Sequence, residues 1–233
     1  MKPDAPAFRT TQRVLFGLIL LDGALVLLGL ALYPSVLQEG GLLGASAAIL
    51  MVCLYGFLAL YSPISIAKVP MQIWRTGAIA GTMGGIWLGL DLLSNYFIYR
   101  DGATNSKISL VVYGVYFLLM LVTAIRGSVI TKRFVAGLTA ALWYVLADQL
   151  IWFTVEFSSY YLFSRTAVGT VFIHEEMYAD FVRSGGHNFQ TFVIGDFFGA
   201  GFFHLLLIGL VAVLLVGSIG AGIGKLISSR RQP

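Results

Sequence analysis

The hydrophobic positions of this chain fall into six long runs that are separated by shorter polar segments. A helix needs about 20 predominantly apolar residues to cross a membrane. On that criterion the sequence places six transmembrane helices at approximately 14–33, 42–62, 76–99, 108–125, 134–157 and 196–224. The pattern predicts an all-α polytopic membrane helix bundle, organised as a single membrane domain over residues 1–233.

The longest segment between two runs, about 158–195, has a pattern of its own. From His174 to Ser184, apolar side chains and charged side chains recur on different faces of a helix. Acidic residues lie near its start, and Gly185 and Gly186 follow its end, as helix signals require. We expect a short amphipathic helix here, lying on the outer membrane surface or capping the bundle.

Composition supports a membrane protein. The chain is 58% hydrophobic and 11% charged, with a mean hydropathy of +0.86, whereas a soluble domain of this size needs a more highly charged surface. The basic residues lie between the apolar runs and not on one face or tail, which argues against a nucleic-acid partner.

The distribution of Lys and Arg predicts an orientation. Cytoplasmic segments carry an excess of basic residues in short loops. If both termini are cytoplasmic, most basic residues fall inside, including Lys2, Lys68 and Arg231. The outer segments then hold only Arg100, Lys107, Arg165 and Arg183. We therefore expect a multi-pass protein of a bacterial cytoplasmic membrane with cytoplasmic N- and C-termini.

Small residues recur at helical spacing in two of the runs. Stripes of this kind let membrane helices approach closely. The candidate helix-packing residues are Gly77, Gly81, Gly85 and Gly89 in the third run, and Gly217, Gly220, Ala221 and Gly224 in the sixth. We expect the third and sixth helices to pack antiparallel near Gly77 and Gly220. A sliding or gating interface is the alternative.

Acidic residues at membrane depth are the strongest functional signal. A charge near the bilayer centre costs about 2.5–3.5 kcal/mol on insertion scales and usually faces protein or a water-filled cavity. The candidate substrate- or proton-binding residues are Asp22, Asp91, Asp148, Glu156, Asp196 and His204. We expect four of these five acids to surround a cavity that opens outward beneath residues 158–195.

A structural interpretation of the same residues remains open. Glu156 can be interfacial, and Asp196 can cap the sixth helix at its positive end. Asp22 can be a hydrogen-bonded packing residue, and His204 can be a histidine of the core.

No intact catalytic motif is present. His174-Glu175-Glu176-Met177-Tyr178 begins like a zinc-protease helix but has Tyr178 in place of the second histidine ligand. Cys53 is the only cysteine, so the sequence contains no thiolate metal site. We expect a non-enzymatic protein with no catalytic or metal site, and the sequence assigns no cofactor.

These features favour a component that binds or transports a small solute or ion through an outward-facing polar cavity. The alternative is a non-catalytic structural or accessory subunit, packed through its glycine faces within a larger membrane complex. Expected partners are the lipid bilayer and other membrane subunits or further copies of the chain.

Overall fold

The structure is a computed structural model that describes residues 5–38, 41–65 and 69–230. Within these residues every regular element is a helix. In chain order they are α1 (Ala5–Leu32), η1 (Pro34–Leu37), α2 (Gly41–Ser65), α3 (Met71–Ser94), α4 (Gly102–Thr131), α5 (Phe134–Phe163), α6 (Ala167–Ser184), α7 (Phe189–Phe203), η2 (His204–Val211), η3 (Val213–Gly217) and α8 (Ser218–Ser229). Lys2, Lys68 and Arg231, used above for the orientation, lie outside the described residues.

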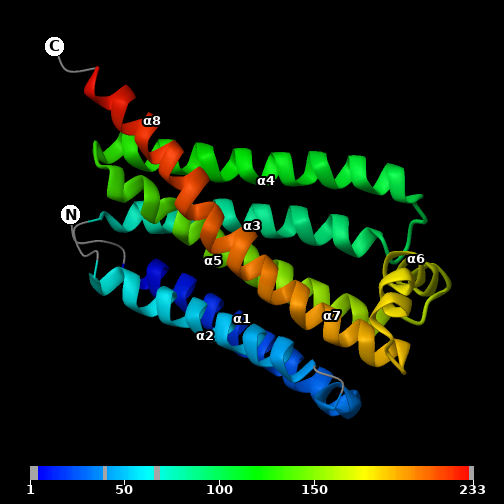
Figure 1. Ribbon diagram of the computed structural model, residues 1–233. Helices are drawn as coiled ribbons and strands as arrows, with labels where there is room; N and C mark the ends of the chain where they lie inside the picture. Colours follow the sequence, from blue (N-terminus) through cyan, green and yellow to red (C-terminus); the bar gives the residue numbers. More distant parts are fainter. Residues whose placement is uncertain (1–4, 39–40, 66–68, 231–233) are drawn as a thin grey trace.

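Six of the described helical segments are long and apolar enough to cross a membrane, as the sequence predicted. They are Arg9–Leu32, Gly41–Ser62, Met71–Ser94, Gly102–Thr131, Phe134–Phe163 and Phe189–Ser229. The last combines α7, η2, η3 and α8 into one rod. In Figure 1 the rods run lengthwise, α1 begins and α8 ends at one end of the bundle, and α6 lies at the opposite end.

Most helix boundaries differ by several residues from the sequence-based expectation, and three of the differences concern the outer end of the bundle. The third run ends at Ser94 and not near residue 99, because the chain turns there and Arg100 reaches back to Ser94 and Asp91. The fifth continues to Phe163. The sixth begins at Phe189, where Asn188 caps it, so the alternative interpretation in which Asp196 caps this helix is wrong.

The amphipathic segment is helical over a longer range than expected. α6 starts at the Thr166 cap and ends at Gly185, whose φ of +68° suits a residue without a Cβ. Phe181 contacts the rings of Phe189 and Phe192, while Tyr178 and Val182 are exposed. Only part of the expected apolar face is therefore covered.

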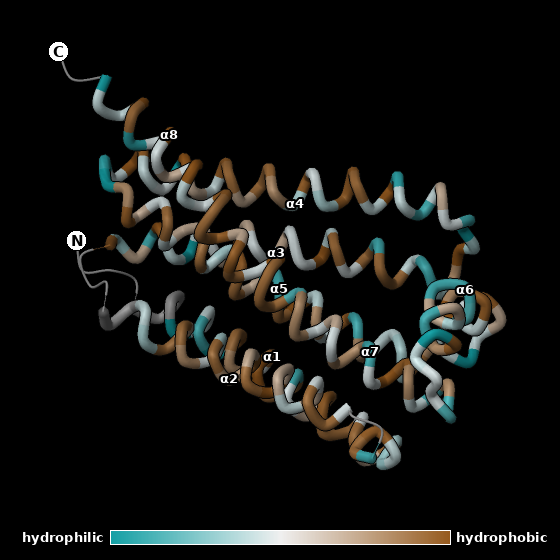
Figure 2. The backbone as a smooth tube through the Cα atoms, viewed as in Figure 1, coloured by the Kyte–Doolittle hydropathy of each residue, from teal (hydrophilic) through white to brown (hydrophobic). Residues whose placement is uncertain are grey.

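α5 is the central helix of the bundle. In its candidate span 72% of the residues in the most apolar stretch are buried, against 22% in α1 and 28% in α4. It packs against α3, α4, α1 and α8. The outer helices instead present large apolar side chains, such as Leu20, Leu43 and Leu110, which are each more than 70% exposed. Figure 2 shows apolar residues along all the rods and hydrophilic ones gathered near their ends and in α6.

The glycine stripe of α3 lies directly on the backbone of α5. A Cβ at Gly77 or Gly81 would collide with the carbonyl oxygen of Ala140 or Tyr144, and one at Gly85 would lie 2.7 Å from the carbonyl oxygen of Asp148. Successive glycines thus meet every fourth carbonyl of α5, a contact that no larger residue allows.

The expected pairing of the third and sixth helices is wrong. Gly220 lies against the carbonyl of Leu121 and Gly224 against that of Ile125, both in α4. Each glycine stripe therefore packs on a neighbour that runs in the same direction as itself, α3 on α5 and α8 on α4. A stripe of small residues shows that a helix approaches closely but does not specify which one.

The contact between α3 and α5 gives a stability prediction. Gly81→Ala should lower the free energy of unfolding by about 1–3 kcal/mol, because the new methyl group meets the Tyr144 backbone. Gly114→Ala is the matched control, since a Cβ there meets nothing within 4 Å. Unfolding of the detergent-solubilised protein measures both, and equal stability of the two variants would contradict the assigned contact.

Candidate functional site

A buried polar cluster lies in the middle of the bundle around α5. It consists of Tyr55 (α2), Tyr116 (α4) and Tyr144, Asp148 and Gln149 (α5), and we call it the central cluster. All five residues have no exposed surface. The Gln149 amide nitrogen donates to Asp148 Oδ2 at 2.8 Å and to the Tyr116 hydroxyl at 3.5 Å. Asp148 also lies within electrostatic range of all three tyrosines.

Two acceptor atoms of the central cluster have no hydrogen-bond partner among the described residues, Asp148 Oδ1 and Gln149 Oε1. Buried polar atoms are nearly always paired in folded proteins, so these two acceptors have hydrogen-bonding capacity that the described residues do not use. Gly84 of α3 is next to Oδ1, since a Cβ there would lie 2.6 Å from that oxygen.

The central cluster is tied to an irregular part of the last helix. Residues 204–211 and 213–217 form π-helical turns. Such turns are rare in proteins, and those that occur often lie at functional sites. The Tyr55 hydroxyl donates to the Leu205 carbonyl and the Tyr116 hydroxyl to the Ile208 carbonyl, both at 2.8 Å. Gly209 makes room for the Tyr55 hydroxyl, which a Cβ would meet. Two tyrosines from two helices therefore hold carbonyls of the wide turns.

His204, the first residue of η2, joins a neighbouring group. Its ring stacks on Trp152 with centroids 3.6 Å apart and planes 7° apart, and its Nε2 hydrogen-bonds the Tyr113 hydroxyl at 2.9 Å. Tyr113 is within electrostatic range of Glu156, Asp91 and Asp148. His204 Nδ1 has no partner in the described part of the chain. The pair of Tyr113 and His204 therefore lies among three of the candidate acids.

Asp148, Trp152 and Glu156 follow one another at four-residue spacing, which places them on one face of α5. Glu156 is 8% exposed, and within the described ranges its Oε2 has no hydrogen-bond partner. Glu156 lies within electrostatic range of Asp196 and of Tyr96. The row leads from the central cluster towards the end of the bundle that carries α6.

Asp91 differs from Asp148 because it has a cationic partner. Arg100 donates to Asp91 Oδ1 at 3.0 Å and to the hydroxyl of Ser94. No apolar run of the sequence contains Lys or Arg, so a partner for Asp91 is not apparent from the sequence. Arg100 lies beyond the helix end and folds back onto its last turn, which a search within the span cannot find.

Asp22 occupies another contact of α5. It has no exposed surface and accepts a hydrogen bond from Thr154 at 2.5 Å, which links α1 to α5. Its Oδ2 has no partner among the residues described. Thr154 does not belong to the row of residues 148, 152 and 156, so Asp22 is separate from that row.

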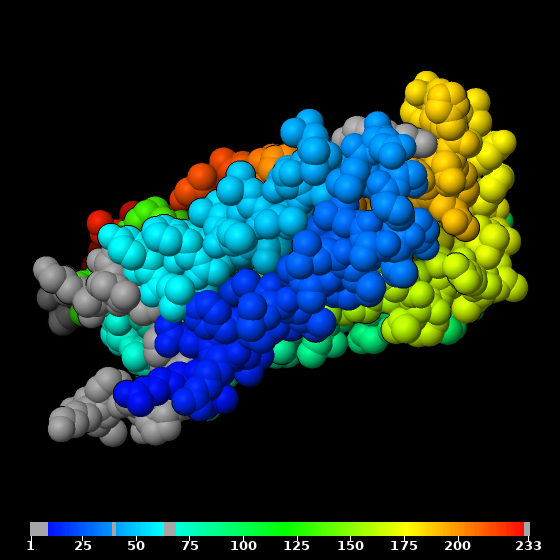
Figure 3. All heavy atoms as spheres, turned by 90° about the horizontal axis from the view of Figure 1, so that it is seen from below, coloured from blue at the N-terminus to red at the C-terminus, as the bar shows by residue number. Residues whose placement is uncertain are grey.

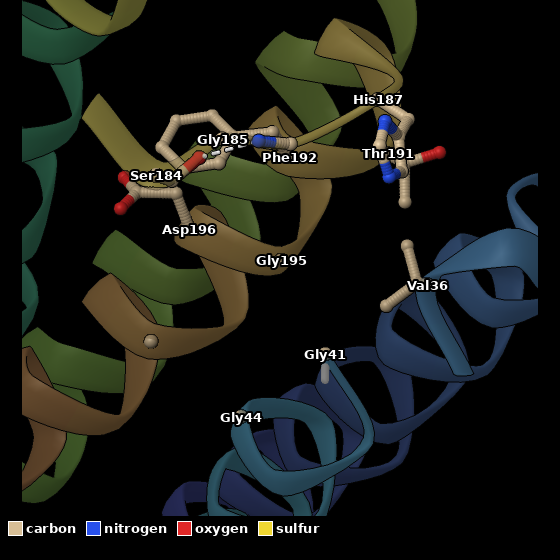
Figure 4. Close-up of a pocket in the computed structure, with 12 residues that line it drawn as sticks. Val36, Gly41, Gly44, Ser184, Gly185, His187, Thr191, Phe192, Gly195 and Asp196 are labelled. Carbon is tan, nitrogen blue, oxygen red and sulfur yellow. Dashed lines mark hydrogen bonds between the residues drawn. The ribbon is translucent and has the colours of Figure 1, made fainter. Parts of the chain in front are cut away.

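Asp196 lines a cavity of about 530 Å³ at the α6 end of the bundle. Figure 4 shows Asp196 and Ser184 on one side and Gly41, Gly44 and Val36 on the other. Asp91, Asp148 and Glu156 do not line this cavity. The acids are therefore not gathered around this opening as expected, and Asp91, Asp148 and Glu156 lie instead within electrostatic range of Tyr113.

Comparisons with known proteins give no further assignment. No protein-family model matches the chain, and no match was found among curated proteins or among solved structures. Within the described residues no group of three or more His, Cys, Asp and Glu side chains is placed to hold a metal ion.

Hydrogen bonds outside the spans fix the α6 end. Tyr99 donates to Glu175 at 3.2 Å, and this carboxylate raises the pKa of the Tyr99 hydroxyl. Asp101 caps α4 by accepting from the side chain and backbone of Thr104, which lowers the pKa of Asp101. A lowered pKa means that this cap stabilises α4 at neutral pH and is lost as acid protonates Asp101.

The pair of Asp91 and Arg100 gives a second prediction. Their side chains are only 16% and 15% exposed, so a double-mutant cycle with Asp91→Asn and Arg100→Gln should give a coupling energy above about 1 kcal/mol. The pair of Asp180 and Arg183 is the control, because its side chains are 55% and 78% exposed and its coupling should be smaller. Denaturant unfolding measures both cycles; a coupling near zero for Asp91 and Arg100 would rule out the ion pair.

Proposed function

We propose that this chain is a membrane component that binds and transports an ion or a proton-linked small solute, with Asp148 as the binding or protonation residue. One observation carries the proposal. Asp148 is fully buried at mid-helix, one of its oxygens has no hydrogen-bond partner among the described residues, and the hydrogen bond that it does accept comes from a neutral amide.

The free-energy cost of a buried charge distinguishes Asp148 from Asp91. A carboxylate in a low-dielectric interior is costly unless a cation or several hydrogen bonds compensate it. Within the described chain, Asp91 obtains a cation from Arg100, whereas the groups around Asp148 are an amide and phenols. The carboxyl group of Asp148 is therefore suited to take up a proton or a small cation and to release it again.

The row along α5 supplies a route for that exchange. Asp148, Trp152 with the stacked His204, and Glu156 succeed one another towards the α6 end. Tyr113 bridges the row, since it hydrogen-bonds His204 and lies within range of Asp148 and Glu156. Chains of acids and histidines of this kind serve as proton relays in transporters. The cavity at Asp196 provides an entrance at the same end.

The basic residues support an orientation for the proposal. At the end of the bundle where α1 begins and α8 ends, the helix bounds place the described residues Arg9, Arg75, Arg126, Arg133 and Lys225. The opposite end carries fewer described basic residues. By the positive-inside rule the termini are cytoplasmic and α6 is external. We place the protein in a bacterial cytoplasmic membrane as a non-enzymatic transport component.

The alternative, an accessory subunit held in a larger complex by its glycine faces, has less support. Gly77, Gly81 and Gly85 lie against α5, and Gly220 and Gly224 lie against α4, all within one chain. These stripes are thus not available to a neighbouring protein. Other membrane subunits or further copies of the chain remain partners that the proposal allows on the remaining apolar faces.

The proposal predicts a loss of transport in Asp148→Asn. The purified protein in liposomes should carry protons or Na⁺ under an imposed gradient, followed with a pH-sensitive dye and with radioactive Na⁺. Asp148→Asn should lower the flux by at least about tenfold, because the amide cannot exchange a proton at neutral pH. Asp180→Asn is the control, since Asp180 is exposed on α6.

A second variant separates loss of the site from loss of the fold. Gly84→Ala keeps the carboxyl group but places a methyl group against Asp148 Oδ1 and the Tyr144 hydroxyl, so it should also lower the flux. Gly114→Ala should leave the flux unchanged, because a Cβ at this position meets nothing within 4 Å. Elution as a single folded species in detergent checks each variant. Full flux in a folded Asp148→Asn variant would discard the assignment.

A further inference from the structure

Two neighbouring cavities at the α6 end form a second candidate site, separate from Asp148. Their volumes are about 540 and 240 Å³, within or near the range usual for small-ligand pockets. Four residues line both cavities: Tyr33, Ser164, Arg165 and Gln190. Figure 3 views the face on which the end of α1 and η1, in blue, meets the yellow-green and yellow segments of α5 to α7.

Arg165 distinguishes these cavities. It lies in the short link between α5 and α6, is exposed, and forms no ion pair with any described residue. Two other arginines at this end are neutralised by acids, Arg100 by Asp91 and Arg183 by Asp180. An unpaired guanidinium at the mouth of a cavity presents five donors in a fork that fits carboxylate and phosphate oxygens.

The walls around Arg165 are polar, aromatic and fixed in place. Ser35 and Thr191 share a hydrogen bond of 2.6 Å that joins η1 to α7, and the Tyr161 hydroxyl donates to the Leu25 carbonyl at 2.9 Å. Asn188 and Gln190 bring the start of α7 to the cavity, and the positive end of a helix dipole favours an anion. Among the residues that the structure describes, no acidic side chain lines either cavity.

We propose that these cavities bind an oxyanion, a carboxylate or phosphate group, with Arg165 as the anchoring cation and Ser164 and Gln190 as further hydrogen-bonding residues. The ring of Tyr33 forms the wall beside them. The chemistry is shared by two sources, the headgroup of an anionic phospholipid and a small soluble anion. The site does not depend on the transport proposal, because the central cluster shares no residue with it.

The test measures anion binding with the whole chain. Thermal unfolding in a neutral detergent is followed while phosphatidylglycerol, inorganic phosphate or succinate is titrated. At least one of these should stabilise the wild-type protein, and Arg165→Ala and Arg165→Gln should each weaken the apparent Kd by roughly tenfold or more, as loss of a charged hydrogen bond implies. Lys107→Ala, which removes the same charge at the same end outside the cavities, should bind as the wild type does.

The outcomes separate the two sources and the two proposals. Stabilisation by phosphatidylglycerol alone assigns a lipid headgroup, and stabilisation by phosphate or succinate assigns a soluble anion. Asp148→Asn should retain the anion affinity even if it abolishes transport, so each proposal can fail alone. Equal affinity of the wild-type protein and both Arg165 variants, or no stabilisation by any of the three anions, would overturn the proposal.

Discussion

The close contact between the bare face of α3 and the backbone of α5 is the constraint on which the rest of the structure depends. Gly77, Gly81 and Gly85 have no side chains, so the two helices approach until Cα atoms of one meet carbonyls of the other. In water each glycine inside a helix costs about 1 kcal/mol relative to alanine. In lipid, helices associate through packing and not through hydrophobic burial, so the close approach that glycine allows is favoured. The result is a central helix that its neighbours shield from lipid.

That shielding explains how α5 tolerates its polar residues. Asp148, Gln149 and Glu156 would be costly on a lipid-facing surface, but α5 meets α3, α4, α1 and α8 instead. The polar residues are linked in turn to the π-helical turns of the last rod through Tyr55 and Tyr116. The same helix therefore carries the packing of the bundle and its candidate chemistry. The irregular backbone lies where phenol hydroxyls satisfy its carbonyls, as membrane proteins require.

Much of the architecture follows from the sequence, because a membrane span must satisfy its backbone internally and face lipid with apolar side chains. The six spans can therefore be recognised from the apolar composition of their sequence. The end of α6 is also visible, since Gly185 is a helix-stop residue with a left-handed backbone. The start of the last rod was harder to predict. Asn188 caps this helix, but the pattern of apolar residues does not favour Asn188 over Asp196 as the cap.

The candidate site was predictable in its acids and not in their surroundings. The rarity of acids at membrane depth pointed to Asp148, but Tyr113 and Tyr116 read as ordinary members of an apolar run. Their hydroxyls join the candidate site only because they hydrogen-bond His204 and Ile208, which lie about 90 residues away in the chain. The partner of Asp91 was missed for a similar reason, because a turn and not a helical spacing brings Arg100 to it.

The most direct test of the account is a density map of the protein in lipid nanodiscs at a resolution that shows ordered water. We expect density for a water molecule or an ion within hydrogen-bond distance of Asp148 Oδ1 or Gln149 Oε1, and contact between α3 and α5 through Gly81 and Gly85. A map that resolves water elsewhere but shows both oxygens in contact only with apolar side chains would contradict a binding or protonation role for Asp148.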